Sequence, residues 1–152
     1  MKIWLMKSEP NCYSIDDLKK DGKTQWEGVR NYQARNFMMK DMSLNDAVLF
    51  YHSNAKPPGI AGLAKVCRLS YPDYFAWDEE SDYFDPRSTQ EKPIWHMVDV
   101  AFVKKFDQLI SLPKLRLTSE LADMKVLQKG SRLSIQPVDK SHYDFICDHM
   151  IN

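Results

Sequence analysis

The sequence is poor in cysteine and has no long apolar run, and both features narrow the class of protein. Its three cysteines, Cys12, Cys67 and Cys147, are far apart, with no CxxC pair and no histidine at ligand spacing. They predict neither a disulfide framework nor a zinc site, but reduced thiols in a cytosolic protein. The apolar run at residues 3–6 is too short for a signal peptide or a membrane span. We therefore expect no membrane partner, and a cytoplasmic location that would be nuclear in a eukaryote.

The sequence motifs of common enzyme classes are also absent. There is no GxSxG, no P-loop, no HExxH and no GxGxxG, and nothing indicates a cofactor or a metal. His52 follows Tyr51 and precedes Ser53 at the end of a predicted strand, where it could line a pocket or simply complete a turn. Glu9, beside Ser8, could accept a hydrogen bond from a ligand or cap a helix. An enzyme that uses His52 or Glu9 as a general base therefore stays an alternative.

Positive and negative charges balance over the whole chain but not along it. A chain of 152 residues, 43% of them hydrophobic, is long enough for one core, so we expect a single domain spanning residues 1–152. Lys plus Arg and Asp plus Glu both number 21. Residues 1–40 carry eight bases against five acids, whereas residues 73–85 carry six acids and no base. A basic face for nucleic acid must therefore be balanced by an acidic face elsewhere on the protein, and plain solvated charge is the alternative.

Hydrophobic patterning predicts more strands than helices. The expected strands cover residues 3–6, 46–52, 60–69, 94–106 and 132–138. Gly62, inside the third of these strands, indicates a bulge or a close approach of the backbone. Three of the expected helices follow the N-cap residues Ser14, Asn31 and Asp139, and a fourth helical passage opens at Leu112-Pro113. Residues 71–90, rich in aromatic and acidic side chains, predict a long ordered loop of the kind that is often functional. Because the strands are not spaced as βαβ units, we expect an α+β fold whose mostly antiparallel sheet closes into a small barrel.

The stretch at residues 26–36, WEGVRNYQARN, is the strongest candidate for a binding site. Indole and phenol rings offer faces for stacking, carboxamides both donate and accept, and guanidinium groups bind oxygens or anions. Gly28 allows a close backbone approach or a positive φ. Asn31 can cap the helix that follows, whose free amide groups would favour anions. For each residue alone a core or surface role is the simpler interpretation, but the cluster indicates recognition of something flat and polar.

These residue types suit a nucleobase lifted out of its stack, each aromatic contact contributing about 1–3 kcal/mol. The expected pocket has aromatic walls, hydrogen-bonding edges and one nearby histidine, supplied by Trp4, Trp26, Tyr32, Tyr51, Ser8, Glu9, Asn31, Ser53, Gln136 and His52. The expected phosphate contacts are the cations Lys7, Arg30, Arg35 and Lys56. Binding through them should weaken with salt.

The same motifs give the chain a family resemblance. Residues 4–10 (WLMKSEP), 26–36 (WEGVRNYQARN) and 50–53 (FYHS) resemble the EVE domain, as do the later motifs GIAG (59–62), YPD (71–73), FDPR (84–87), WHMVDV (95–100) and RLSIQPV (132–138). The family includes stand-alone bacterial proteins and a eukaryotic nuclear protein. The resemblance implies a PUA-like pseudo-barrel flanked by short helices and related to YTH and ASCH domains. It also implies a pocket for a modified nucleobase, with methylated cytosine or adenine as proposed ligands.

The sequence thus predicts a non-enzymatic protein that binds a modified base in DNA or RNA, as a monomer or weak dimer. Two alternatives stay open. One is an enzyme acting on a modified nucleotide or a small amide. The other is a protein-interaction domain that docks a partner through the aromatic, acidic loop.

Overall fold

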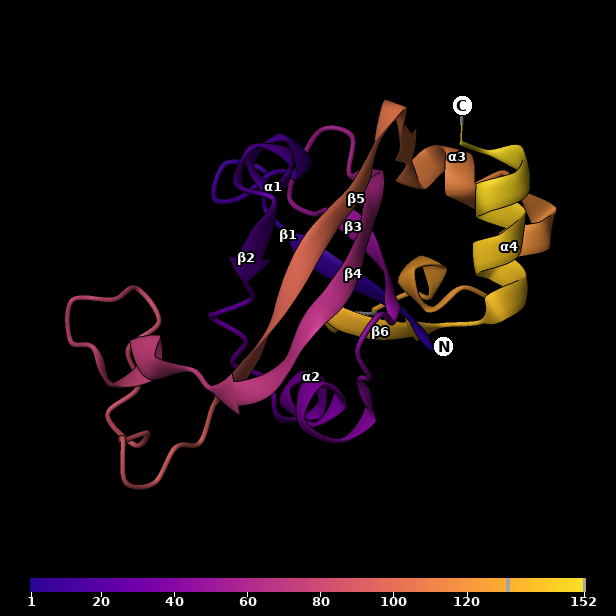
Figure 1. The fold of residues 1–152 in the computed structure, drawn as a ribbon. Helices are drawn as coiled ribbons and strands as arrows, with labels where there is room; N and C mark the ends of the chain where they lie inside the picture. Colours follow the sequence, from indigo (N-terminus) through magenta and orange to yellow (C-terminus); the bar gives the residue numbers. More distant parts are fainter. Residues whose placement is uncertain (131, 152) are drawn as a thin grey trace.

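The computed structural model describes residues 1–130 and 132–151, and its centre is one six-stranded sheet (Figure 1). The strands are β1 (Ile3–Ser8), β2 (Lys23–Gln25), β3 (Ala47–His52), β4 (Gly59–Pro72), β5 (His96–Ser111) and β6 (Ile135–Val138). The α-helices are α1 (Ile15–Asp21), α2 (Tyr32–Asn36), α3 (Leu112–Arg116) and α4 (Lys140–His149). A π-helical turn (Phe37–Asp41) and three 3-10 helices (Tyr74–Trp77, Ser119–Leu121, Lys125–Leu127) complete the described elements.

The sheet has the order β2-β5-β4-β3-β1-β6 and is mixed. β1 pairs with β3 in parallel, and the other four pairings are antiparallel. The α+β class and the mostly antiparallel sheet are therefore confirmed, but the expected closure into a barrel was wrong. In the described part of the chain, β2 and β6 each pair on one side only, and they are three and four residues long. The sheet is therefore open between β2 and β6.

The two longest strands bend strongly, and one glycine explains part of the bend. β4 and β5 change register at several points along their length (Figure 1). At Gly62 a Cβ atom would collide with the backbone oxygen of Lys104 and with the side chain of Ile15. The sequence interpretation of Gly62 as a bulge or close approach is thus confirmed.

The sheet separates two apolar clusters. Alternate β1 residues Trp4 and Met6 face a cluster that includes Ile15 of α1 and Ala34 of α2. The residues between them face a second cluster that includes Leu115 of α3 and Ile146 of α4. Figure 1 shows α3 and α4 together on that second side. This alternation decides which side chains of β1 and β3 can meet.

Two of the predicted helix caps are present and a third is not. Ser14 and Asp17 form a reciprocal capping box at the start of α1. The Asn31 side chain accepts a hydrogen bond from the Ala34 backbone N–H at 3.0 Å, as expected of an N-cap. Asp139 precedes α4, but its side chain makes no capping hydrogen bond.

The segment between β4 and β5, residues 73–95, is called the aromatic loop below. It projects from one end of the sheet at the lower left of Figure 1. It begins with Asp73, which is fully buried and whose carboxylate accepts from the Phe75 N–H at 3.0 Å. The short strand β2, which the sequence interpretation missed, pairs with β5 close to this loop. No helix in the described part of the chain is long and apolar enough to cross a bilayer.

Candidate functional site

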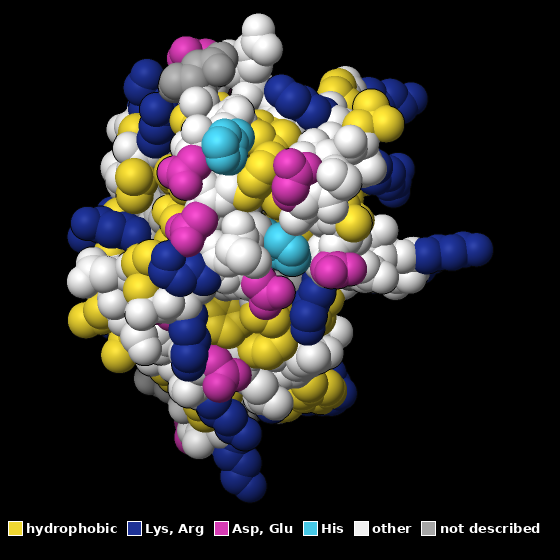
Figure 2. Space-filling view, turned by 90° about the vertical axis from the view of Figure 1, so that its right-hand side faces the viewer, with side chains coloured by type: hydrophobic (Ala, Val, Ile, Leu, Met, Phe, Trp, Pro, Cys, Tyr) yellow, Lys and Arg dark blue, Asp and Glu magenta, His cyan; other side chains and the backbone are white. Residues whose placement is uncertain are grey.

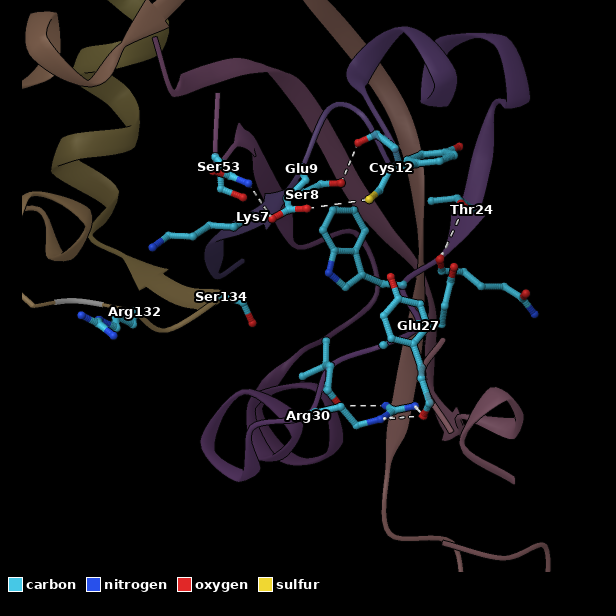
Figure 3. A pocket seen from close by; sticks show the side chains of 17 residues that line it. Lys7, Ser8, Glu9, Cys12, Thr24, Glu27, Arg30, Ser53, Arg132 and Ser134 are labelled. Atoms are coloured by element: carbon cyan, nitrogen blue, oxygen red, sulfur yellow. Dashed lines mark hydrogen bonds between the residues drawn. The ribbon is translucent and has the colours of Figure 1, made fainter. Parts of the chain in front are cut away.

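A cavity of about 1070 Å³ lies where five chain segments meet (Figure 3). It is lined by the end of β1 and the turn after it, by residues 24–30 from β2 to the turn before α2, by Ser53 and Asn54 after β3, by Tyr83 of the aromatic loop, and by Arg132 and Ser134 before β6. The first strand's exit and the glycine-bearing turn thus converge on one hollow. Pockets of this size are at the upper end for small ligands, so it has room for a base and more.

Backbone hydrogen bonds hold the segments around the cavity together. Because β1 and β3 are parallel, their ends lie at one edge, and the Ser53 N–H donates to the Ser8 carbonyl at 3.0 Å. The Lys7 N–H donates to the Ser134 carbonyl at 2.9 Å, which joins β1 to the segment that enters β6. The rim of the cavity is therefore fixed by the sheet rather than by loop packing.

Trp26 forms part of the cavity wall and also belongs to the core. Its side chain is 8% exposed, its ring meets Phe50 edge-on with centroids 5.5 Å apart, and its backbone N–H donates to the Val98 carbonyl at 2.8 Å. The indole is thus held in one orientation, with one part packed and another facing the hollow. A rigid aromatic wall of this kind suits stacking.

Gly28 brings the aromatic loop onto the cavity. Its φ is +84°, and a Cβ at this position would lie 2.6 Å from the ring of Tyr83. Only glycine combines this backbone conformation with so close a contact. Tyr83 therefore packs directly on the turn and supplies a second aromatic side chain to the cavity lining.

A buried carboxylate fixes the turn and the loop to each other. One oxygen of Asp73 accepts from the Gly28 N–H at 2.9 Å and from Arg30 Nη1 at 3.0 Å. Arg30 also donates to the Tyr83 carbonyl, from Nε at 3.1 Å and from Nη2 at 2.6 Å. Although Arg30 lines the cavity, its guanidinium is thus engaged in hydrogen bonds that hold the turn and the aromatic loop together.

The polar groups of the cavity are partly engaged with one another. The Ser8 hydroxyl donates to the Tyr13 carbonyl at 2.6 Å, which leaves its oxygen able to accept. Glu9 accepts from Asn54 Nδ2 at 3.2 Å and from the Cys12 thiol at 3.8 Å. These bonds order the side chains on the β1 side of the cavity before any ligand arrives.

Burial shifts the pKa of four titratable groups in the lining and raises that of Tyr13 to about 12. It lowers the pKa of Lys7 and raises the pKa of Glu27, with the charge of Asp73 adding to the effect on Glu27. Burial also raises the pKa of Tyr83, and Glu27 raises it further. Each shift reflects a low-polarity environment, which is where charged groups gain most from a complementary ligand.

Six of the predicted site residues line this cavity: Lys7, Ser8, Glu9, Trp26, Arg30 and Ser53. Two predicted aromatic walls do not. Trp4 is 2% exposed on the α1 side of the sheet, and its indole N–H donates to an oxygen of buried Asp46 at 3.0 Å. Tyr51 is buried on the opposite side of the sheet, in the cluster that α3 and α4 cover.

The third predicted wall, Tyr32, also lies outside the cavity lining, with Arg35 beside it. Tyr32 is 50% exposed and stacks on Trp95 with ring centroids 4.9 Å apart. The Arg35 guanidinium lies 4.9 Å from the Tyr32 ring and donates to the Ile94 carbonyl at 3.0 Å and to the Asn36 side chain. Arg35 therefore joins α2 to the aromatic loop rather than facing the cavity.

The remaining predicted residues have other positions. Asn31 caps α2, and Lys56 is exposed in the loop between β3 and β4. His52 Nε2 accepts from the Ile15 N–H at 3.1 Å, so its lone pair is engaged at the start of α1, and burial lowers its pKa. Gln136 is buried and donates to the Leu133 carbonyl at 3.0 Å.

Sequence reasoning missed other cavity residues: Cys12, Tyr13, Thr24, Gln25, Asn54, Arg132 and Ser134, and it gave Glu27 no role. Several of them adjoin residues that it did name, so a wider window around the two converging segments would have included them. Arg132 had no such signal, because only the β1–β6 pairing brings it to the cavity. Among the described residues, no group of three or more His, Cys, Asp or Glu could hold a metal ion.

An α+β fold with an open mixed sheet of this order agrees with the PUA-like class that the sequence resemblance implied. The chain belongs to the EVE domain family, whose model matches residues 2–149.

Its relatives agree with this assignment. It is 42% identical to human thymocyte nuclear protein 1 over 94% of this chain and 71% of that protein. A hypothetical protein from Leishmania major superposes with a TM-score of 0.93 at 51% identity, covering 97% of this chain and 93% of that one. Human THYN1, solved in complex with 5-methylcytosine-containing DNA, superposes with a TM-score of 0.89 at 41% identity, covering 97% and 96%.

Proposed function

We propose that this protein binds nucleic acid without catalysing a reaction and takes a modified nucleobase into the cavity between Trp26 and Tyr83. The observation that carries the proposal is the pair of aromatic side chains on one hollow, one fixed in the core and one held against Gly28. A related human protein, 41% identical, was solved with 5-methylcytosine-containing DNA, which supports the same ligand class.

The chemistry of the lining fits a base that has left its stack. Aromatic faces stack with any base, and each such contact contributes about 1–3 kcal/mol. The hydroxyl oxygen of Ser8 and the amide of Asn54 can form hydrogen bonds with the polar edge of the base. The Glu27 carboxylate can accept a hydrogen bond from an exocyclic amino group, which cytosine and adenine both carry. The size of the cavity leaves space for a substituent on the base.

The other two candidate functions receive less support. The acceptor nitrogen of His52 is already bound by the Ile15 N–H, and His52 lies outside the cavity lining, which argues against a general base there. For a protein-interaction domain, the exposed aromatic side chains of the loop include Tyr74 and Phe84. The ring of Tyr83, however, packs against Gly28 and is therefore not fully available to a protein partner.

Figure 2 shows acidic, basic and hydrophobic side chains interspersed over the face that α3 and α4 cover. That mixed face offers nucleic acid no continuous basic surface.

A titration with oligonucleotides tests the proposal. The panel contains plain and modified cytosine and adenine in single- and double-stranded DNA and RNA, and the readout is tryptophan fluorescence. We expect at least one modified base to quench the emission, with an affinity above that of its unmodified counterpart. Flat curves over the whole panel would contradict the proposal.

Two variants of the aromatic loop identify the surface used. Tyr83→Ala removes a cavity side chain and should weaken binding about tenfold or more, at the stacking contribution given above. Phe84→Ala is the matched control, since Phe84 is a neighbouring exposed aromatic residue outside the cavity lining. Equal losses in both variants would instead favour a partner docked on the loop.

A further inference from the structure

We propose that Lys7 and Arg132 form an anion subsite at the rim of the cavity, which takes the phosphate of the nucleotide whose base the cavity holds. This inference rests on the proposed function and deepens it, because it fixes the direction from which the sugar–phosphate backbone reaches the site.

The arginines of the 26–36 stretch are engaged elsewhere. Arg30 is tied to Asp73 and to the Tyr83 carbonyl, and Arg35 to the Ile94 carbonyl and the Asn36 side chain. Moving either guanidinium to a phosphate would break hydrogen bonds that hold the aromatic loop. Phosphate recognition on this side of the cavity would therefore disrupt the site that it is meant to serve.

Lys7 presents the opposite situation. Its side chain is half-buried at the rim, and the described part of the chain gives its ammonium no carboxylate within ion-pair distance. Its Nζ lies 5.9 Å from the centroid of the Tyr51 ring, so the ammonium is at the part of the rim nearest the side of the sheet that α3 and α4 cover. Burial lowers the pKa of Lys7, as it does for a cation that has lost water without gaining a counter-ion. An anion placed beside it would restore the lost stabilisation.

Arg132 stands next to Lys7 because the sheet brings the two segments together. The Lys7 N–H donates to the Ser134 carbonyl, two residues beyond Arg132, and all three residues line the cavity. Figure 3 shows Lys7, Arg132 and Ser134 on one side of the cavity. Arg132 is exposed, and among the described residues it too has no carboxylate within ion-pair distance. A guanidinium and an ammonium on one rim make a site for a phosphate rather than for a neutral group.

The positions of the two carboxylates in the lining, Glu9 and Glu27, indicate how a bound nucleotide is oriented. Figure 3 shows Glu27 across the cavity from Lys7 and Arg132. Glu9 lies nearer to them, but Asn54 and Cys12 already donate to its carboxylate. A nucleotide therefore fits best with its phosphate at the Lys7–Arg132 rim and an amino-bearing base edge toward Glu27.

The first experiment compares 5-methyl-2′-deoxycytidine with its 5′- and 3′-monophosphates by isothermal titration calorimetry on the full chain. We expect one of the monophosphates to bind about tenfold more tightly than the nucleoside, the magnitude of a charge-assisted hydrogen bond. Lys7→Met together with Arg132→Ala should remove that advantage, so that the monophosphate binds no more tightly than the nucleoside. Lys140→Ala, on α4 and paired with Asp144, is the control that should change neither value.

The second experiment does not depend on the identity of the base. With a single-stranded oligonucleotide lacking modified bases, the slope of log K against log salt should be shallower by about one for each of the two cations removed. An unchanged slope in the double variant, or monophosphates that bind no better than the nucleoside, would overturn the anion subsite alone. Failure of the wild-type protein to bind any oligonucleotide or nucleotide would overturn the proposed function as well. Circular dichroism of the variants confirms that they fold.

Discussion

The two ends of the cavity are built in opposite ways. At the end formed by the turn and the aromatic loop, Arg30 and Asp73 are bonded to each other and to the backbone, and Tyr83 rests on Gly28. At the end formed by β1 and the segment before β6, the cations are left without carboxylate partners in the described part of the chain. The first end is complete without a ligand and sets the shape. In the proposed function, the phosphate of the ligand completes the second end.

The largest effect that separates the two ends should come from removing one arginine from each. Arg30→Ala leaves fully buried Asp73 without its counter-ion and should lower the free energy of unfolding by about 3 kcal/mol. Arg132→Ala removes an exposed side chain and should change it by no more than about 0.5 kcal/mol. Urea denaturation followed by tryptophan fluorescence measures both.

Arg30→Lys sharpens the same comparison. It keeps the charge but cannot donate to Asp73 and to the Tyr83 carbonyl at once in the geometry of the guanidinium. Its stability should therefore lie between those of the wild type and Arg30→Ala. Equal stability of the Arg30→Ala and Arg132→Ala variants would remove the distinction between the two ends.

Gly28→Ala should lower the free energy of unfolding by about 2 kcal/mol, because a positive φ is costly for alanine and the added Cβ would meet the ring of Tyr83. Gly22→Ala is the matched control. Gly22 also has a positive φ, +81°, but a Cβ there would meet nothing within 4 Å. The difference between the two variants in thermal or urea denaturation isolates the contact with Tyr83.

A double-mutant cycle with Tyr83→Ala tests that explanation directly. If the ring causes the extra loss, Gly28→Ala should cost less in the Tyr83→Ala background, and the two changes should couple. Strict additivity would show that backbone strain alone accounts for the effect.

Lys7→Met should raise the free energy of unfolding, by less than the two preceding substitutions lower it. Since burial lowers the pKa of Lys7, its charged form destabilises the folded state at neutral pH, where the amine is protonated in both states. Methionine should thus raise stability by about 0.5 kcal/mol at pH 7 while weakening nucleotide binding. The gain should vanish as the pH rises past the unfolded-state pKa of about 10.4. A loss of stability at pH 7 would assign Lys7 a structural role.

The smallest effect is expected for Glu27→Gln. The pKa of Glu27 is raised by burial and by Asp73, so the folded state prefers the protonated form and is penalised when the carboxylate is charged. Protein atoms surround part of this residue, but much of its surface stays in water, so the gain from glutamine at pH 7 should be only a few tenths of a kcal/mol. It should disappear below the ordinary pKa of about 4.3. Thermal melts of both proteins from pH 3 to pH 7 give the trend.

Local features of the fold could be predicted from the sequence because their causes are local. Ser14 and Asn31 were predicted as caps, and both side chains accept the expected backbone N–H. The close approach at Gly62 was predicted from a glycine inside a strand pattern. β2 was missed, since a three-residue edge strand has no periodicity to detect.

The composition of the site depended on long-range pairing, which the sequence alone does not show. Arg30 was expected to contact phosphate, but its partner Asp73 lies 43 residues away and is buried. Trp4 and Tyr51 were placed in one pocket, although the register pairs Trp4 with Val48 and therefore puts Tyr51 on the other face. The two-residue alternation of strands explains this result once the pairing of β1 with β3 is known.

The parallel pairing of β1 with β3 has one further consequence. Ser8 and Ser53 reach the rim together only because both strands run the same number of residues from matched starting points to a shared exit. Deleting a single residue from either strand would exchange its inward and outward side chains and rotate the exit away. The geometry of the rim therefore fixes the lengths of these two strands, whichever amino acids the rim itself carries.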